Sequence, residues 1–214
     1  LCGPRNKEGQ VQQPDHLQLP YFYALPKVHK NPWKTCPVVS CGVSTVVEPL
    51  SRWIDTQLKR VIHLLPSYTS KLDGNLFEPY KTLQPSHPNS LYTADVASMY
   101  SNINTDHGIA TITRWLELHR TELPPDFPTA LVLDGLDTVI RYNVFSFGPR
   151  RFLQLTGTAM VTSCACNYST IHYSYHEETN LLSNDAHLLL FYCRFIDDAM
   201  IIHRASPNGF ANLI

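Results

Sequence analysis

Residues 188–203 read Leu-Leu-Leu-Phe-Tyr-Cys-Arg-Phe-Ile-Asp-Asp-Ala-Met-Ile-Ile-His, two apolar runs on either side of a pair of aspartates. This pattern predicts two buried strands, 188–195 and 199–203, joined as a hairpin at Ile196-Asp197-Asp198. Aspartate is a common turn residue, so a plain hairpin tip explains the dipeptide taken alone. Adjacent carboxylates repel each other unless a cation neutralises them, and a hard divalent ion with oxygen ligands is the alternative explanation.

Two stretches upstream carry further candidate site residues. Residues 91–96 predict a strand with Asp95 near its carboxyl end, a common position for ligand-binding groups, although turn or helix-cap chemistry explains Asp95 equally well. Gln154-Leu155-Thr156-Gly157-Thr158-Ala159-Met160 leads from a strand into a helix, and its small residues would let a ligand or nucleic acid approach the backbone closely. Taken alone, this stretch is only a strand-to-helix connection.

The other elements follow from periodicity and turn residues. We expect strands at 21–25 (ended by Pro26) and 37–40, a hairpin of 144–147 and 152–155 around Gly148-Pro149, and helices at 46–65, 105–118, 130–140 and 158–180, with a short helix near 76–83.

Composition narrows the class of protein. The chain has 214 residues, 43% hydrophobic and 16% charged, with a formal net charge of -1, which excludes a mainly disordered chain. No apolar run approaches the roughly 18–20 residues of a membrane helix, so we expect no membrane association. The first fifteen residues are polar and do not resemble a secretory signal. Basic residues exceed acidic ones in 1–60 and acidic residues dominate 61–214, an asymmetry that suits a polyanion-binding arm beside a carboxylate site but is, taken alone, best explained by chance.

Cysteine and histidine spacings argue against a zinc site. The six cysteines include no C-x-x-C pair, so we expect free thiols rather than zinc ligands or disulfides. His172 and His176 have helical spacing but lack the adjacent glutamate of a zinc-protease helix, so we expect them to be core or surface residues.

In combination and in this order, the strand ending near Asp95, the Gln-x-x-Gly-Thr-Ala-Met stretch and the Asp-Asp hairpin resemble the palm of a reverse transcriptase. Four stretches resemble fingers and palm motifs of the Penelope-like retroelements, relatives of telomerase: Tyr23-Ala24-Leu25-Pro26-Lys27-Val28-His29-Lys30, Pro37-Val38-Val39-Ser40, Asp95-Val96-Ala97-Ser98-Met99-Tyr100-Ser101-Asn102-Ile103 and Arg194-Phe195-Ile196-Asp197-Asp198. The resemblance covers 19–203 and implies an α/β (α+β) fold: right-hand polymerase fingers and palm, with an antiparallel palm sheet backed by helices.

The resemblance also implies a domain organisation. We expect a loose N-terminal arm at 1–18, a fingers-like region at 19–90 and a palm-like region at 91–214, with no thumb. Because the chain begins at Leu1 rather than at Met, we expect a segment of a longer reading frame. The family implies an intracellular, nuclear location; the residues give no oligomeric state.

The implied activity is RNA-directed DNA polymerase, with an RNA template, a DNA primer and deoxynucleoside triphosphates as partners. In this family two Mg²⁺ ions, about 3.5–4 Å apart, serve phosphoryl transfer. By resemblance, the catalytic carboxylates and metal ligands are Asp95, Asp197 and Asp198, and the carbonyl of Val96 is a further metal ligand.

The resemblance assigns five substrate-binding residues. Lys27 and Lys30 would meet the triphosphate or the template backbone as point charges. Tyr100 matches the family's steric gate, which excludes a 2′-hydroxyl; without the surrounding motif a core tyrosine would be the better explanation. Gln154 and Gly157 match residues that line the incoming nucleotide and the template.

Three positions depart from the family pattern. Cys36 stands where the family usually has an arginine that grips the triphosphate. Val161 replaces a second glycine and adds bulk, and Phe195 replaces the more usual tyrosine. These departures leave open a catalytically decayed, nucleic-acid-binding relic of such a domain. A plain α/β binding domain would require the ordered motifs to be coincidence.

Overall fold

The structure is a computed structural model of the 214-residue chain that describes residues 19–28, 31–40, 45–65, 89–183 and 189–204. The expected arm at 1–18 and short helix near 76–83 lie outside these ranges. The chain forms two compact units, 1–61 with 100–168 and 62–99 with 169–214. The fold is the expected mixed α/β one, with mainly antiparallel sheets backed by helices. The assignment of 19–90 as fingers-like and 91–214 as palm-like stays a prediction.

Each unit contains elements from two separate parts of the sequence. The first unit holds β1 (Tyr21–Lys27), β2 (Lys34–Ser40), α1 (Glu48–Lys59), α3 (Thr105–Leu118), α4 (Thr129–Arg141), β4 (Val144–Phe147), β5 (Arg150–Leu153) and the first turn of α5 (Ala165–His176). The second unit holds the short 3-10 helix η1 (Ile62–Leu64), β3 (Asn89–Asp95), the rest of α5, its π-helical extension η3 (Glu177–Leu182), β6 (Leu189–Phe195) and β7 (Asp198–Arg204).

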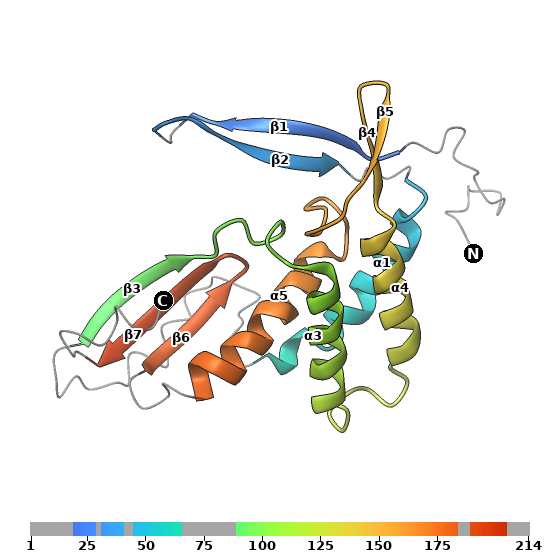
Figure 1. Ribbon diagram of the computed structural model, residues 1–214. Coiled ribbons are helices and arrows are strands. Elements are labelled where there is room, and N and C mark those ends of the chain that lie inside the picture. The colour runs from blue at the N-terminus through green and yellow to red at the C-terminus, as the bar shows by residue number, and fades with distance from the viewer. Residues whose placement is uncertain (1–18, 29–30, 41–44, 66–88, 184–188, 205–214) are drawn as a thin grey trace, which may run out of the picture. The chain divides into compact units, whose positions relative to one another are not determined.

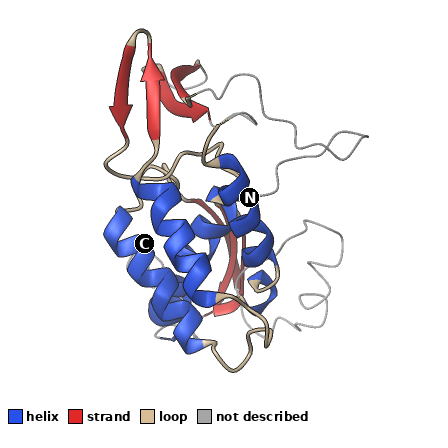
Figure 2. Ribbon diagram, turned by 90° about the vertical axis from the view of Figure 1, so that its right-hand side faces the viewer, coloured by secondary structure: helices blue, strands red, loops and turns tan. Residues whose placement is uncertain are grey.

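The first unit has a four-stranded sheet in the order β2-β1-β4-β5, whose two hairpins extend away from the helices of that unit (Figures 1 and 2). β1 and β4 pair in parallel where Tyr21 lies opposite Ser146. The expected end of the first strand at Pro26 is wrong, because β1 runs to Lys27. β1 pairs with β4 only at Tyr21, so near Pro26 the edge of β1 that faces away from β2 has no partner strand. A proline, which has no N–H to donate, is tolerated at such an edge.

Helices α1, α3 and α4 form the core of the first unit. α4 contacts both α1 and α3, and the fully buried side chains include Ile54 on α1, Trp115 on α3 and Leu136 on α4. α3 begins and ends where the sequence predicts. Asn104 caps its start by accepting a 3.0 Å hydrogen bond from the His107 amide.

Polar side chains join α1 to the residues around the start of α5, all within the first unit. Ser163 Oγ donates to Glu48 Oε1 at 2.8 Å, and the Cys164 amide donates to Ser51 Oγ at 3.0 Å. One turn further, Asn167 Nδ2 donates to Asp55 Oδ1 at 2.7 Å. These three hydrogen bonds therefore give polar groups of one segment partners on the other.

α5 begins at Ala165 rather than at 158 as expected. Gly157 has a left-handed backbone (φ 74°), and the Thr158 amide donates to the Tyr100 carbonyl at 2.8 Å. Both features take the backbone out of the helical path, so the helix starts only after this turn.

The second unit has a three-stranded antiparallel sheet in the order β3-β7-β6, packed against its part of α5. Ile201 and Ile202 of β7 and Ile171 of α5 are among the buried side chains of this unit. Leu91 of β3 lies opposite Ile202 of β7. Tyr192 of β6 lies opposite Ile201 of β7, which confirms the predicted hairpin around Ile196 and Asp197. Within the described residues, no helix is both long and apolar enough to cross a membrane.

Candidate active site

Three aspartates lie at one end of the sheet of the second unit. β3 ends at Asp95, which lies directly opposite Asp198, the first residue of β7. Asp197 occupies the preceding turn, and its carbonyl accepts a 2.8 Å hydrogen bond from the Val96 amide. Figure 1 shows the end of β3 beside the turn between β6 and β7. The strand register thus places Asp95 directly opposite Asp198, which is far from it in the sequence.

The chemistry of these side chains fits a hard divalent cation. Directly opposite residues of an antiparallel pair have Cβ atoms about 4.5–5.5 Å apart, so Asp95 and Asp198 carry like charges at close range. All three aspartates are exposed, which leaves their oxygens accessible to an ion. Carboxylate and carbonyl oxygens are the ligands that Mg²⁺ and Mn²⁺ prefer. Ligation by the three carboxylates and by the Val96 carbonyl remains a prediction.

The backbone on both sides of the aspartates is held in unusual conformations. Ile196, immediately before Asp197, has φ 55°, and Ser98, three residues after Asp95, has φ 54°. A left-handed backbone is particularly unfavourable for a β-branched residue such as Ile196. Tyr173 on α5 donates to the carbonyl of the buried Met99 at 3.0 Å, which anchors the chain after Asp95.

A buried arginine lies next to this turn, and the sequence analysis missed its role. Arg194 is fully buried, and its Nη1 donates to the Ile196 carbonyl at 2.7 Å. Glu177 forms an ion pair with it, with 2.5 Å between Arg194 Nε and Glu177 Oε1. An arginine between the apolar strand residues Cys193 and Phe195 was the available signal, because a charged residue there must be paired if it is buried.

In the first unit, Gly157 packs against the backbone of the segment that begins at Tyr100. Its amide donates to the Ile103 carbonyl at 2.9 Å. A Cβ at position 157 would lie 2.8 Å from Ser101 Cα and 2.9 Å from Ser101 O. The contact with Ser101 is sufficient to require glycine at position 157. The contact of Gly157 with a nucleotide or template stays a prediction. Tyr100 itself is half-buried. Its role as a steric gate also stays a prediction.

Gln154 uses its side-chain amide within the protein. Oε1 accepts from Asn143 Nδ2 at 2.8 Å, and Nε2 donates to the Thr156 carbonyl at 3.1 Å. The amide therefore fixes the turn that leads to Gly157. Direct contact between Gln154 and a nucleotide stays a prediction and would require these bonds to be shared or exchanged.

The basic residues described between positions 19 and 60 fall into two groups. Lys27 and Lys34 are exposed and lie opposite each other at the far end of the β1–β2 hairpin, whereas Lys30 lies outside the described residues. The cations on and just after α1 are paired with acidic side chains: Arg52 with Glu48 at 2.6 Å, Lys59 with Asp55 at 2.7 Å and Arg60 with Asp126 at 2.5 Å. The hairpin is therefore the better candidate for a phosphate contact.

Two of the three departures from the expected pattern, Cys36 and Val161, lie in the first unit. Cys36 lies on β2 opposite Leu25 and is half-buried, and Val161 is 43% exposed. The cysteines in the described parts of the chain (Cys36, Cys164, Cys166 and Cys193) are free, as expected. Burial raises the pKa of the Cys164 thiol to about 12.

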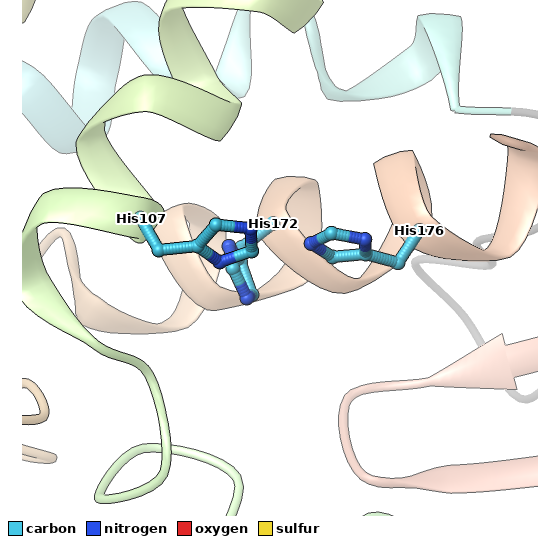
Figure 3. Close-up of side chains that lie close together, drawn as sticks. All are labelled: His107, His172 and His176. Carbon is cyan, nitrogen blue, oxygen red and sulfur yellow. The ribbon is translucent and has the colours of Figure 1, made fainter.

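The histidines of α5 lie on successive turns of that helix. Figure 3 shows His172 and His176, whose ring centroids are 4.9 Å apart, together with His107 from the first turn of α3. His172 is buried and His176 is half-buried. The expectation that the pair consists of core or surface residues rather than zinc ligands stays a prediction.

The site residues named from the sequence thus form two groups. The second unit brings together Asp95, Val96, Asp197 and Asp198, and the first unit brings together Tyr100, Gln154 and Gly157, with Lys27 on a separate hairpin.

Comparison of the structure with solved structures finds nucleic-acid polymerases. Telomerase from Candida albicans, solved with a fragment of telomeric RNA, matches with a TM-score of 0.58 and 11% identity, over 94% of this chain and 39% of that one. Telomerase from Candida tropicalis, also solved with a telomeric RNA fragment, has a TM-score of 0.60 and 11% identity, over 91% and 37%. An RNA polymerase complex inside a double-stranded RNA virus has a TM-score of 0.56 and 14% identity, over 90% and 19%.

These matches identify the fold at a coarse level. The chain spans about two-fifths of the length of the telomerase chains that it matches. No protein-family model and no curated protein sequence matches the chain. The similarity to telomerase, which is a reverse transcriptase, and to viral RNA polymerases shows that this chain has a nucleic-acid-polymerase-like fold.

Proposed function

We propose that the chain is the fingers and palm of an RNA-directed DNA polymerase of the Penelope-like type. It would add deoxynucleotides to a primer 3′-OH on an RNA template. The observation that carries the proposal is the meeting of Asp95, Asp197 and Asp198 at one end of an antiparallel sheet in a polymerase-like fold. Exposed carboxylates at one end of a sheet suit a reaction whose main requirement is charge neutralisation at a phosphate.

The proposed chemistry assigns a limited task to each residue. Bound Mg²⁺ would stabilise the charge that develops on the attacking and leaving oxygens. Asp95, Asp197 and Asp198 would hold the Mg²⁺ ions in place. The hydrogen bond from the Val96 amide to the Asp197 carbonyl keeps the two strand ends in register. Lys27 would bind a phosphate as a point charge, and Tyr100 would exclude a 2′-hydroxyl by contact.

Nucleic acid is the partner class that the similarities support. Two of the telomerase structures contain a telomeric RNA fragment, which supports RNA binding by the shared fold. We extend the proposal to an RNA template, a DNA primer and deoxynucleoside triphosphates, and to a nuclear location.

Primer extension tests the proposal. The 214-residue chain is incubated with poly(rA), an oligo(dT) primer, dTTP and Mg²⁺ or Mn²⁺. Asp197→Asn should lower the rate by a factor of about 10² or more, because several kcal/mol of charge stabilisation depend on the metal ligands. Asp134→Asn, which changes an exposed aspartate on α4, is the matched control and should have no effect. Extension with UTP but not with dTTP would contradict the assignment to DNA synthesis.

A second candidate function is nucleic-acid binding without catalysis. It is favoured by Cys36, which supplies a thiol where a guanidinium would grip the triphosphate, and by the exposed side chain of Val161. This candidate predicts that the wild-type chain binds an RNA–DNA hybrid but does not extend it. If Cys36→Arg then creates extension, the chain is a decayed polymerase whose carboxylate site is still competent.

A further inference from the structure

Arg194 is the most deeply buried charge in the described residues of the second unit, and its donors converge on a few partners. Its side chain has no exposed surface. Nε donates to Glu177 Oε1 at 2.5 Å and Nη2 to Glu177 Oε2 at 3.3 Å. Nη2 also donates to Ser174 Oγ at 2.7 Å and to the Thr170 carbonyl at 3.0 Å. The guanidinium is thus held against α5 and its π-helical extension.

The anchor is itself held in place. Tyr192, two residues before Arg194 on β6, donates its hydroxyl to Glu177 Oε1 at 2.7 Å. Burial, and next the charge of Glu177, raise the pKa of the Tyr192 phenol, so this hydroxyl stays a donor. Glu177 is only 12% exposed, which keeps water from competing for its oxygens.

Stability alone does not account for this arrangement. Taking a guanidinium and a carboxylate out of water is costly, and a well-packed apolar pair of similar size is often at least as stable. A further contact of the guanidinium is more specific: Nη1 donates to the Ile196 carbonyl at 2.7 Å. Ile196 has the left-handed backbone (φ 55°) and directly precedes Asp197 and Asp198. An unfavourable conformation of this kind persists only where surrounding contacts hold it.

We propose that Arg194 is a positioning residue for the carboxylate site, holding the Ile196 carbonyl so that the turn presents Asp197 and Asp198 to a divalent cation. This inference rests on the proposed function, because it assumes that the aspartates bind metal. It assigns Glu177, Ser174 and Thr170 to fixing the guanidinium. The connection to the turn uses Nη1, whereas Nε and Nη2 hold the guanidinium against α5, so a side chain that keeps the positive charge but loses the fork of donors should not replace arginine.

Binding of Mn²⁺ to the 214-residue chain, followed by electron paramagnetic resonance of the free ion, tests the proposal without requiring polymerase activity. Arg194→Lys should weaken Mn²⁺ binding by about 10-fold or more, as is typical when a group that orients metal ligands is removed. Arg141→Lys is the matched control, because Arg141 also pairs with two carboxylates, Asp106 and Asp137, each at 2.6 Å. It should leave the affinity unchanged. In primer extension, the Mn²⁺ concentration for half-maximal rate should rise by the same factor for Arg194→Lys.

The affinity separates positioning from a merely structural role. Loss of folded protein lowers the number of Mn²⁺ sites but leaves the dissociation constant of the remaining sites unchanged. If Arg194→Lys does not fold, Ser174→Ala decides instead, since it removes one neutral hydrogen-bond partner and leaves the ion pair with Glu177. Ser174→Ala should weaken binding in the same direction, by a smaller factor.

The outcomes separate the positioning role of Arg194 from the proposed function. If the wild-type chain binds Mn²⁺ and Asp197→Asn abolishes binding, but the folded Arg194 and Ser174 variants bind with wild-type affinity, the positioning role is overturned and the proposed function stands. If the wild-type chain does not bind Mn²⁺ at all, the proposed function and the role of Arg194 fall together.

Discussion

Replacing Gly157 with alanine should destabilise the first unit more than the same replacement at Gly148. Both glycines have a left-handed backbone, with φ 74° at Gly157 and φ 57° at Gly148. Only Gly157 has backbone against it: a Cβ there would lie 2.8 Å from Ser101 Cα, whereas a Cβ at Gly148 would meet no atom within 4 Å. The pair therefore separates the cost of the dihedral angle from the cost of the contact.

The two costs have different magnitudes. A left-handed backbone costs a residue with a Cβ about 1–2 kcal/mol, and the smaller entropy of the unfolded alanine chain offsets about 0.4–1 kcal/mol of this. Gly148→Ala should therefore lower the free energy of unfolding by about 0–1.6 kcal/mol. At Gly157 the neighbouring atoms are backbone and cannot rotate away, so overpacking adds about 1–3 kcal/mol.

Urea denaturation followed by tryptophan fluorescence measures this difference. Trp115 on α3 is fully buried and reports on the first unit. Free energies of unfolding from the two variants and the wild type are compared at equal slope against urea. Equal losses for Gly157→Ala and Gly148→Ala would show that the Tyr100–Ser101 backbone is not tightly packed on position 157, and would refute the steric argument.

Three other results are expected. Tyr100→Val should raise ribonucleotide incorporation relative to deoxynucleotide incorporation, measured as a ratio of kcat/KM in which tenfold is about 1.4 kcal/mol; an unchanged ratio with a lower melting temperature would assign Tyr100 to the core. Affinity for an RNA–DNA hybrid should fall steeply with salt and weaken in Lys27→Glu, as fluorescence anisotropy would detect; salt-independent binding would count against a phosphate contact. Between pH 9 and about 12 the unfolded chain ionises Cys164 while the folded chain keeps its proton, so stability should fall as pH rises; Cys164→Ala should flatten that fall in urea titrations, and an unaltered slope would be inconsistent with this origin.

The elements that could be predicted from the sequence are those fixed by local signals. α3 matches its predicted range because both of its signals are local: the apolar spacing lies within the helix, and the capping residue Asn104 directly precedes it. The hairpin around Asp197 follows from two apolar runs and a turn. The parallel pairing of Tyr21 with Ser146 could not be predicted, because it depends on the packing of distant segments.

The position of the aspartates at one sheet end could be predicted from the motifs, whereas the contacts that support them could not. The motifs indicate Asp95 and Asp197, and the register brings both to one sheet end. The use of Gly157 against Ser101, and the burial of Arg194 against α5, depend on tertiary contacts that no local pattern encodes. An arginine in an apolar strand is visible in the sequence, but its partners are not.

The polar pairs between α1 and the start of α5 make this contact between segments intolerant of sliding. Apolar side chains pack acceptably at several offsets, but Glu48 with Ser163, and Ser51 with Cys164, meet at only one. A slip of one helical turn, about 5.4 Å, would separate both pairs and leave the buried Glu48 carboxylate without its Ser163 partner. The position at which α5 begins is therefore specified by side chains more than one hundred residues earlier in the chain, so insertions or deletions between the two segments should be tolerated only where they preserve this alignment.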